Sequence, residues 1–417
     1  MAVLFAINIL NFYDRHVPGA LTEPIRKEFQ LSDTQVGWLG TAFTLIYAVV
    51  GLPIGRRADS GSRKTLLAWG VVAWSALTAM AGAATNYTML LVSRLGVGVG
   101  EAVCAPVGTS WIGDLFKPHE RSRALALFML GVPIGGALSY FFSGPMAQAF
   151  GWRTAMVMAA APALLLVPLL LRLTEPARGA TEQHAAAPAG SVASILKIPT
   201  LWWIIASGAL VNFNMYAIGT FLPALLGRVH GLGVGRAGVM TGIAYAIGGV
   251  AGGLIAGAWG DRVSRRSKNG RMVSASVAAL LAAPLAWYGI AQPAGAVAVS
   301  LPLLTLAYGC LNAYYGLVYS SIHDIIAPAL RGTAMAVYFL VMYLGGASFG
   351  PLLTGRLSDE MARKAATAAG SAEITEVFRA VGLQQAMLVI PALSVGLALV
   401  LFAGSRTIAR DMERRGA

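Results

Sequence analysis

Residues 272–322 read MVSASVAALLAAPLAWYGIAQPAGAVAVSLPLLTLAYGCLNAYYGLVYSSI and contain no Asp, Glu, Lys or Arg. A membrane-spanning helix needs roughly 20 predominantly apolar residues, so this stretch is long enough for two. The sequence Gln292-Pro293-Ala294-Gly295 predicts a turn between them, because Pro and Gly interrupt helices. The stretch therefore predicts a helical hairpin that crosses a membrane twice.

The rest of the chain repeats this pattern. Of its 417 residues 57% are hydrophobic and 12% are charged, whereas soluble domains carry about 25% charged residues. The hydropathy pattern predicts an all-α membrane protein with twelve spans, in two pseudo-symmetric six-helix bundles. The expected spans cover residues 2–22, 34–55, 65–84, 88–112, 122–147, 153–172, 199–226, 236–259, 272–291, 297–322, 332–356 and 381–404.

The net charge of +13 is better explained by membrane topology than by nucleic-acid binding. With a cytoplasmic N-terminus, 20 of the 31 Lys and Arg residues fall on the inner side and 9 on the outer side. This bias follows the positive-inside rule and predicts that both termini are cytoplasmic. The basic tail, residues 406–417, is then expected to face anionic lipid.

Other classes of function have no support in the sequence. Cys104 and Cys310 both fall in apolar spans, so packing is a better interpretation than a disulfide or a metal site. We find no cleavable signal peptide and no constellation of nucleophile and base. We therefore expect no enzymatic activity, no cofactor and no metal.

A polar stretch divides the chain into two halves. Residues 174–197 predict a cytoplasmic linker between an N-terminal bundle, residues 1–173, and a C-terminal bundle, residues 198–405. The sequence GRRADSGSRK at residues 55–64 returns as GAWGDRVSRR at residues 257–266, with an offset of 202 residues. Parallel repeats of this kind create a pathway where two halves meet.

These two loops resemble the signature loop of the major facilitator superfamily, which is known for twelve-span transporters. The first copy carries Ser60 and Ser62 where the family pattern has Arg and Gly. An acidic side chain near a helix N-terminus is favoured by the helix dipole. We expect the Asp of the loop also to pair with arginines, so that these contacts close the cytoplasmic side. The simpler alternative is that the basic residues of the loop only determine the membrane topology. The predicted gating residues are Gly55, Asp59, Arg63, Arg121, Asp261 and Arg265.

Four charged residues are predicted deep in the membrane: Asp14, Arg15, Arg94 and Glu101. Each central charge costs at least about 2.5 kcal/mol on insertion scales. At 1.5 Å per residue, Asp14 lies roughly 20 Å, Glu101 roughly 15 Å and Arg94 roughly 25 Å from the cytoplasmic side. The four side chains can therefore meet, and they formally sum to zero charge.

Such a cluster could be a static set of ion pairs, or a proton site beside an anion site. A carboxylate balanced between burial and a nearby Arg can titrate near neutral pH. We favour Glu101 as the proton carrier, because its neighbours in the chain are Gly and Ala, and expect Asp14 to stay ionised. Protonation would free Arg15 or Arg94 to bind an anion.

The C-terminal half offers amides and aromatics in place of charges. Clustered Asn in a span needs a polar partner, and a cavity would supply one. A charged half opposite a neutral polar half suits an amphipathic anion. Besides Tyr13 in the first span, the predicted substrate-binding residues here are Asn212, Asn214, Tyr216, Asn312, Tyr315 and Tyr319.

Three stretches narrow the resemblance. NFYDR at residues 11–15, RLGVGVGEA at 94–102 followed by DLF at 114–116, and ERSRALA at 120–126 together resemble the spinster family. The resemblance implies proton-linked movement of lysolipids, including sphingosine-1-phosphate in animal members. It also implies that Asp14 and Glu101 are the protonation pair and that Arg15 and Arg94 contact the headgroup. Transporters of sugar acids carry a similar element.

Three functions therefore remain open. The first is a proton-coupled transporter of an amphipathic anion such as a lysolipid, working by alternating access. The second is a proton symporter of a small organic anion such as a sugar acid, and the third is a membrane receptor or scaffold without transport. For each we expect a monomer in a bacterial inner membrane, in contact with membrane lipids.

Overall fold

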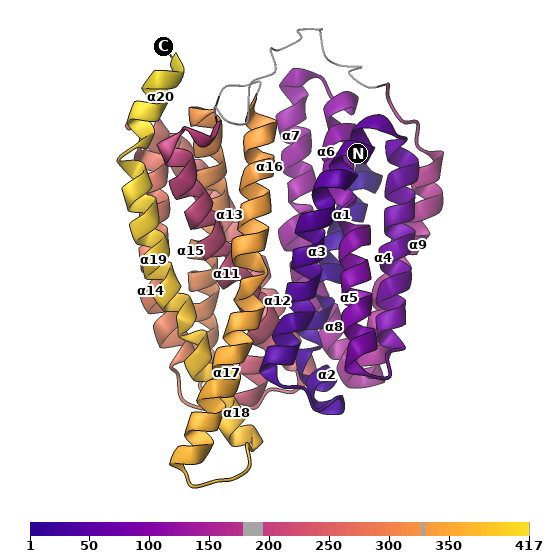
Figure 1. Ribbon diagram of the computed structural model, residues 1–417, viewed down its shortest axis with the longest axis vertical. Coiled ribbons are helices and arrows are strands. Elements are labelled where there is room, and N and C mark those ends of the chain that lie inside the picture. Colours follow the sequence, from indigo (N-terminus) through magenta and orange to yellow (C-terminus); the bar gives the residue numbers. More distant parts are fainter. Residues whose placement is uncertain (178–194, 327–329, 417) are drawn as a thin grey trace. The chain divides into compact units, whose positions relative to one another are not determined.

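The computed structural model describes residues 1–177, 195–326 and 330–416, and every regular element within these ranges is a helix (Figure 1). The first group is α1 (Ala2–Ala20), α2 (Thr22–Glu28), α3 (Asp33–Ser60), α4 (Arg63–Gly82), α5 (Tyr87–Glu101), α6 (Cys104–Leu115), α7 (Pro118–Met129), α8 (Gly131–Phe150) and α9 (Trp152–Arg172). The second group is α11 (Pro199–Arg228), α12 (Val234–Ile243), η1 (Ala244–Gly249), α13 (Val250–Ser264), α14 (Gly270–Ile290), α15 (Val297–Ile325), α16 (Arg331–Met342), η3 (Tyr343–Ala347), α17 (Phe349–Ala368), α18 (Glu376–Met387), α19 (Val389–Ser405) and α20 (Ile408–Gly416).

Eleven helical segments of the described residues are long and apolar enough to cross a membrane, against the twelve that the sequence predicts. The difference is α1, which is not among the eleven. This helix carries buried polar and charged side chains, including Asn8, Asn11, Asp14 and Arg15, which lower its hydropathy. Because α1 packs along α8 in the same bundle, we keep it as the first of the twelve predicted spans.

Several spans consist of two elements. α5 ends at Glu101 and α6 begins at Cys104, so the helix is interrupted beside a predicted site residue. Glycines occupy three of the last six positions of α5, and each favours a break, because Gly costs about 1 kcal/mol in a helix interior. Two other spans each contain a short π-helix, η1 and η3. Such bulges occur mostly as single turns and often at functional sites.

The chain divides into two compact units. Unit 1 comprises residues 1–31, 38–186 and 232–242, and unit 2 comprises residues 32–37, 187–231 and 243–417. The predicted linker, residues 174–197, contains the boundary at residue 187, but its residues 178–194 lie outside the described residues. Two short segments, residues 32–37 and 232–242, belong to a different unit from their neighbours in the predicted bundles.

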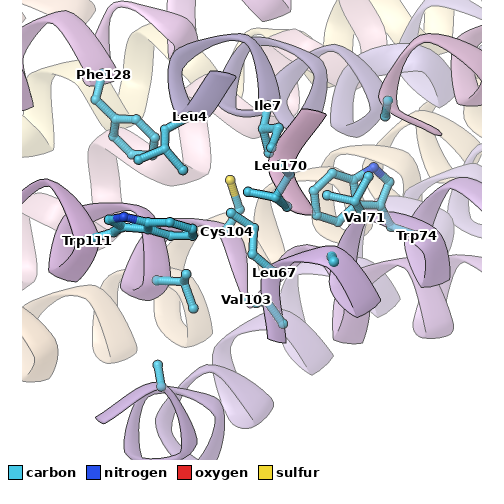
Figure 2. Close-up of a cluster of buried hydrophobic side chains, with 14 of the residues drawn as sticks. Leu4, Ile7, Leu67, Val71, Trp74, Val103, Cys104, Trp111, Phe128 and Leu170 are labelled. Carbon is cyan, nitrogen blue, oxygen red and sulfur yellow. The ribbon is translucent and has the colours of Figure 1, made fainter. Parts of the chain in front are cut away.

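The core of unit 1 is a cluster of large apolar side chains drawn from several helices (Figure 2). Trp74 and Trp111 are each 1% exposed and lie near Phe128 and Leu170 in this cluster. Cys104 lies in the same cluster as a free thiol, in agreement with a packing role. Burial of each large side chain contributes about 1.5–3 kcal/mol where water is the alternative.

Small residues bring α4 and α5 close together. A Cβ on Gly70 would lie 3.0 Å from the carbonyl oxygen of Gly100, and a Cβ on Gly100 would lie 2.8 Å from the amide nitrogen of Trp74. Small residues at helix crossings in membranes allow backbones to approach in this way. The crossing holds α5, and with it the predicted charges, against α4.

Unit 2 is built around α14, which packs against both α15 and α19; Figure 1 shows α14 and α19 side by side. The C-terminal α20 is attached by Asp411, whose carboxylate accepts hydrogen bonds from the amide and the hydroxyl of Thr200 at 3.0 and 2.6 Å. Asp411 thus occupies the N-terminus of α11, where free amides and the helix dipole favour an anion.

Residues 32–37 belong to unit 2 because of a buried polar network. Asp33 accepts two hydrogen bonds of 2.7 Å from Arg228, and a third from Ser358. The carboxylate of Asp359 accepts from the amides of Asp33 and Thr34. Bidentate pairs of this kind are strong and specific in geometry. They attach the first turn of α3 to α11 and α17.

Candidate functional site

α1 presents a polar face to the interior of unit 1. Asn11, Asp14 and Arg15 are three and four residues apart, so they lie on one side of the helix, and they are 2%, 2% and 7% exposed. Asn8, one turn earlier, donates to the carbonyl oxygen of Phe128 at 2.7 Å. This hydrogen bond attaches α1 to Phe128, and it helps to hold Asp14 and Arg15 of the same helix inside the bundle.

α5 contributes the other two predicted charges. Arg94 and Glu101 lie seven residues apart, which places them on the same face two turns apart, and they are 2% and 0% exposed. Electrostatic interactions connect these side chains with Asp14 and Arg15. The structure thus brings together the four charges that the sequence places deep in the membrane.

Within this cluster Arg15 and Glu101 form an ion pair. The Nε atom of Arg15 donates to Oε2 of Glu101 at 3.1 Å, and both side chains are almost fully buried. Arg15 also donates to Oδ1 of Asn11 at 3.5 Å. Glu101 therefore has a partner on another helix, whereas its neighbours in the chain are Gly and Ala.

Asp14 is bound differently. Its Oδ2 atom accepts a hydrogen bond of 2.8 Å from the hydroxyl of Thr78 on α4, which is itself 1% exposed. The other oxygen, Oδ1, is buried and has no hydrogen-bond partner among the described residues. The same holds for Oε1 of Glu101. A buried polar atom without a partner is costly and calls for an explanation.

Arg94, like Asp14, has no ion pair in the described part of the chain. Its Nε atom is buried and has no hydrogen-bond partner there, and no carboxylate lies within 4.0 Å of the guanidinium in that part. Its contact is the ring of Phe43, whose centroid lies 4.8 Å from Cζ. Arg94 therefore offers a positive charge that no carboxylate neutralises directly.

Unit 2 contains a second group of predicted residues. Asn212 on α11 accepts a hydrogen bond of 3.1 Å from the hydroxyl of Tyr315 on α15. The ring of Tyr315 meets that of Tyr319 with centroids 5.5 Å apart, and Tyr319 meets Tyr338 at the same distance. The result is a connected row of tyrosines on α15 and α16 with an amide at one end.

Other predicted residues of unit 2 support its packing. Asn214 is fully buried and donates to the carbonyl oxygen of Ile390 and to the hydroxyl of Ser394, which ties α11 to α19. Asn312 donates to the carbonyl oxygen of Gly249 at 2.6 Å, at the end of η1. The role in substrate binding predicted for these two asparagines stays a prediction.

Two predicted tyrosines have simple contacts. Tyr216 lies 6.2 Å from Tyr343 of η3, measured between ring centroids. In unit 1 the hydroxyl of Tyr13 accepts a hydrogen bond of 3.2 Å from Ser143 on α8. Both tyrosines are half-buried, and their predicted contact with substrate stays a prediction.

The first gating loop contains a buried arginine. Arg63 at the start of α4 is fully buried and pairs with Asp114 of α6 and with Glu175, which follows α9. Glu175 also accepts from the amides of Arg63 and Lys64, so it caps α4. Partial burial alone would raise the pKa of Glu175, but these hydrogen bonds outweigh it and lower that pKa to about 2.

Some of the gating residues have fewer described contacts. Gly55 lies in α3 with open space where a Cβ would be. Arg121 is half-buried on α7. The side chain of Asp59, the predicted acidic residue of this loop, lies outside the described residues.

The second gating loop has its own ion pairs. Arg271 at the start of α14 pairs with Asp324 of α15 at 2.6 Å and with Asp261 at 3.5 Å. Arg265, which corresponds to Arg63 in the sequence repeat, is exposed and forms no ion pair among the described residues. The structural counterpart of the Arg63–Asp114 pair is therefore Arg271–Asp324. The sequence alignment misses it because its offset is not 202 residues.

Sequence reasoning also missed residues of the charge cluster itself. Phe43 and Tyr47 on α3, and Thr78 on α4, lie directly beside the charges. A lone Thr or aromatic residue in an apolar span carries no distinguishing signal in a single sequence. No group of three or more His, Cys, Asp or Glu residues that could hold a metal ion occurs in the described ranges.

Eleven apolar helices with buried, partly unpaired charges define a membrane transporter, and comparison with known proteins agrees. The model of the Major Facilitator Superfamily matches residues 4–351. The chain belongs to this superfamily, whose members are transporters and not enzymes.

Two curated proteins and one solved structure illustrate the relationship. An MFS-type efflux pump of Mycolicibacterium smegmatis is 31% identical over 87% of this chain and 84% of its own length. A probable L-galactonate transporter of Escherichia coli is 26% identical over 86% of this chain and 82% of its own. A crystal structure of a bacterial homolog of the human lysosomal transporter Spinster, inward-facing and unoccupied, has a TM-score of 0.88. It is 28% identical and covers 98% of this chain and 97% of that chain. The predicted resemblance to the spinster family is confirmed.

Proposed function

We propose that this protein is a proton-coupled secondary transporter of an amphipathic organic anion, with Arg94 as the anion-binding residue. The observation that supports it is the different state of the two buried arginines. Arg15 is paired with Glu101, whereas Arg94 has no ion pair among the described residues. Asp14 and Glu101 attract Arg94 electrostatically but form no ion pair with it in the described part of the chain. A buried charge without direct pairing is costly, and the anionic group of a substrate would supply a direct partner.

Proton binding would act through the Arg15–Glu101 pair. When Glu101 is protonated, its attraction for Arg15 is lost and the four-residue cluster changes from neutral to a net positive charge. An anion beside Arg94 is then favoured. By linkage, a bound anion favours the protonated form to the same extent. The two ligands therefore bind together, as coupled transport requires.

The unpaired carboxyl oxygens support a shared proton. Oδ1 of Asp14 and Oε1 of Glu101 are both buried without a hydrogen-bond partner in the described part of the chain, and the two carboxyl groups interact electrostatically. A single proton held between them would satisfy both atoms. We infer a stoichiometry of one proton for the pair, with Thr78 bound to the other oxygen of Asp14.

The amphipathic nature of the substrate rests on the relationship to the spinster homolog and on the composition of unit 2. The row of tyrosines near Asn212 combines apolar rings with hydroxyl groups, which suits a ligand with both apolar and polar parts. A small organic anion such as a sugar acid is the second candidate, because a probable L-galactonate transporter is also related. Arg94 would bind the anionic group of either.

The topology, oligomeric state and location that we propose are those that the sequence predicts. We propose twelve spans with α1 as the first, cytoplasmic termini, a monomer, and residence in a bacterial inner membrane in contact with its lipids. Transport would proceed by alternating access of one binding site to the two sides.

The test is substrate-dependent proton flux into liposomes that contain the purified protein. The two probes are a lysophosphatidate and L-galactonate, each measured with the wild type, Glu101→Gln and Arg94→Gln. We expect proton flux with lysophosphatidate in the wild type and none in Glu101→Gln. Arg94→Gln should lose both binding and flux.

The control variant is Glu373→Gln, which removes a carboxylate from an exposed loop and should behave as the wild type. Flux with L-galactonate alone would replace the substrate class and keep the coupling. Undiminished proton flux in Glu101→Gln would overturn the role of this residue. Absence of flux with both probes in the wild type would overturn the proposal as stated.

A further inference from the structure

Three aromatic rings surround the guanidinium of Arg15. Its Cζ atom lies 4.4 Å from the ring centroid of Phe12, 5.2 Å from that of Phe43 and 4.5 Å from that of Tyr47. Phe43 and Tyr47 are one turn apart on α3 and their rings are stacked at 5.9 Å. Attraction between an arginine and the face of a ring is strongest where water is excluded. Arg15 therefore has a second means of attachment besides Glu101.

Phe43 contacts both buried arginines. Its ring centroid lies 4.8 Å from Cζ of Arg94 as well as 5.2 Å from Cζ of Arg15, and the side chain is 2% exposed. The ring thus lies within reach of two like charges. Each of them is attracted to the electron-rich face of an aromatic ring.

The position of Phe43 depends on a glycine of α5. A Cβ on Gly98 would lie 2.8 Å from the carbonyl oxygen of Phe43 and 2.4 Å from the Cγ2 atom of Ile46. Distances this short exclude any larger residue unless the helices move apart. Gly98 therefore lets α3 approach α5 closely enough for Phe43 to reach the guanidinium groups.

We propose that Phe43 is the positioning residue of the coupling step: it holds the guanidinium of Arg15 in place when Glu101 becomes neutral. This inference rests on the proposed function. Once the carboxylate no longer attracts Arg15, a long flexible side chain would turn toward any other polar group. The rings of Phe43, Phe12 and Tyr47 keep the freed positive charge where Arg94 and the bound anion experience it.

The proposal makes a prediction that depends on pH. At alkaline pH Glu101 is ionised and holds Arg15 by itself, so loss of the Phe43 ring should change anion affinity little. At acid pH Glu101 is neutral, and the three rings and Oδ1 of Asn11 then hold Arg15, with Phe43 as the ring that also contacts Arg94. The variant Phe43→Leu should then bind the anion at least roughly tenfold more weakly. Phe43→Tyr retains the ring and should restore binding at acid pH.

The experiment measures binding of lysophosphatidate and L-galactonate to the purified full-length protein from acid to alkaline pH. The matched control is Phe128→Leu, because Phe128 is also a buried phenylalanine of unit 1, at 1% exposure, and contacts Gly108 instead of a charge. If removal of a buried ring only disturbed the packing, the affinity for the anion would fall equally at all pH values in both Leu variants. A loss confined to acid pH in Phe43→Leu alone supports the proposal.

The double variant Phe43→Leu with Glu101→Gln distinguishes a failure of the role of Phe43 from a failure of the proposed function. Gln cannot form the ion pair, so adding Phe43→Leu should weaken binding at every pH. If Phe43→Leu matches the wild type at all pH values while Glu101→Gln abolishes coupling, the role of Phe43 is disproved and the proposed function stands. If Glu101→Gln leaves coupling intact, or the wild type binds neither probe, the proposed function fails and this inference fails with it.

Discussion

At the scale of single residues, Thr78 shows how a neutral side chain stabilises a charge in the bundle. Its hydroxyl donates a hydrogen bond of 2.8 Å to Oδ2 of Asp14, and both groups are buried. The net contribution of a hydrogen bond to a charged group is about 1.5–3 kcal/mol, more than that of a neutral pair. Thr78 is therefore expected to matter for stability and for proton binding at the carboxyl pair.

Replacement of Thr78 by Val keeps the shape and removes the hydroxyl. We expect Thr78→Val to lower the free energy of unfolding by about 1–3 kcal/mol and to change the pH dependence of substrate-driven proton flux. The control is Thr44→Val, since Thr44 is equally buried but its hydroxyl donates to carbonyl oxygens of its own helix. Equal effects of the two substitutions would show that the contact with Asp14 adds nothing.

At the scale of helices, the start of α4 is where the first gating loop and the beginning of the linker meet. Glu175 caps this helix through the amides of Arg63 and Lys64 and also pairs with the side chain of Arg63. Arg63 in turn pairs with Asp114, so one ion-pair network joins α4, α6 and the segment that follows α9. Unit 2 has a related pair, Arg271–Asp324, between α14 and α15.

The Glu175 cap predicts a pH-dependent stability. Because the pKa of Glu175 is lowered from 4.5 to about 2, its contribution is fully present above about pH 4.5 and is lost as the pH falls toward about 2. The difference in unfolding free energy between the wild type and Glu175→Gln should be about 1–2 kcal/mol near neutral pH, less than the full pKa shift corresponds to, because solvent screens this partly exposed carboxylate. It should shrink over this interval, as measured by denaturant unfolding at each pH.

A control for this effect is again Glu373→Gln, on an exposed loop. A pH-independent difference between the wild type and Glu175→Gln would mean that the carboxylate acts through something other than its charge.

At the scale of the whole molecule, the distribution of positive charge predicts the orientation in the membrane. Lys268 follows α13 and Arg410 lies on α20, and both belong to the predicted cytoplasmic side. Ala294 lies between α14 and α15, and Ala372 between α17 and α18, on the predicted outer side. All four side chains are exposed, so each can be replaced by a reactive cysteine.

Single cysteines at these four positions, in a background that lacks Cys104 and Cys310, test the topology. A membrane-impermeant maleimide added to intact cells should label Ala294→Cys and Ala372→Cys. It should label Lys268→Cys and Arg410→Cys only after the cells are opened. The reverse pattern would invert the topology, and labelling of Lys268→Cys and Ala294→Cys from the same side would show that α14 does not span the membrane.

Much of this protein could be predicted from its sequence. Uncharged runs long enough to cross a bilayer and the repeated loop at residues 55–64 and 257–266 predicted the helical architecture and the superfamily, and both are confirmed. The topology predicted from the excess of Lys and Arg in alternate loops stays a prediction. The four buried charges were recognisable for the same reason: a charge in an apolar span is costly and needs a partner. These inferences rest on local composition, which a single sequence displays directly.

The pairing of those charges was decided by the tertiary structure alone. Which of the carboxylates Arg15 contacts, and that Arg94 has no ion pair in the described residues, depends on how α1 and α5 face each other. Phe43, Tyr47 and Thr78 join the site from α3 and α4 because glycines let the helices approach. Apolar spans look alike in sequence, since lipid and a packed helix favour the same side chains. The sequence therefore determined that charges are buried in this bundle, and only the packing of the helices determined which of them form an ion pair.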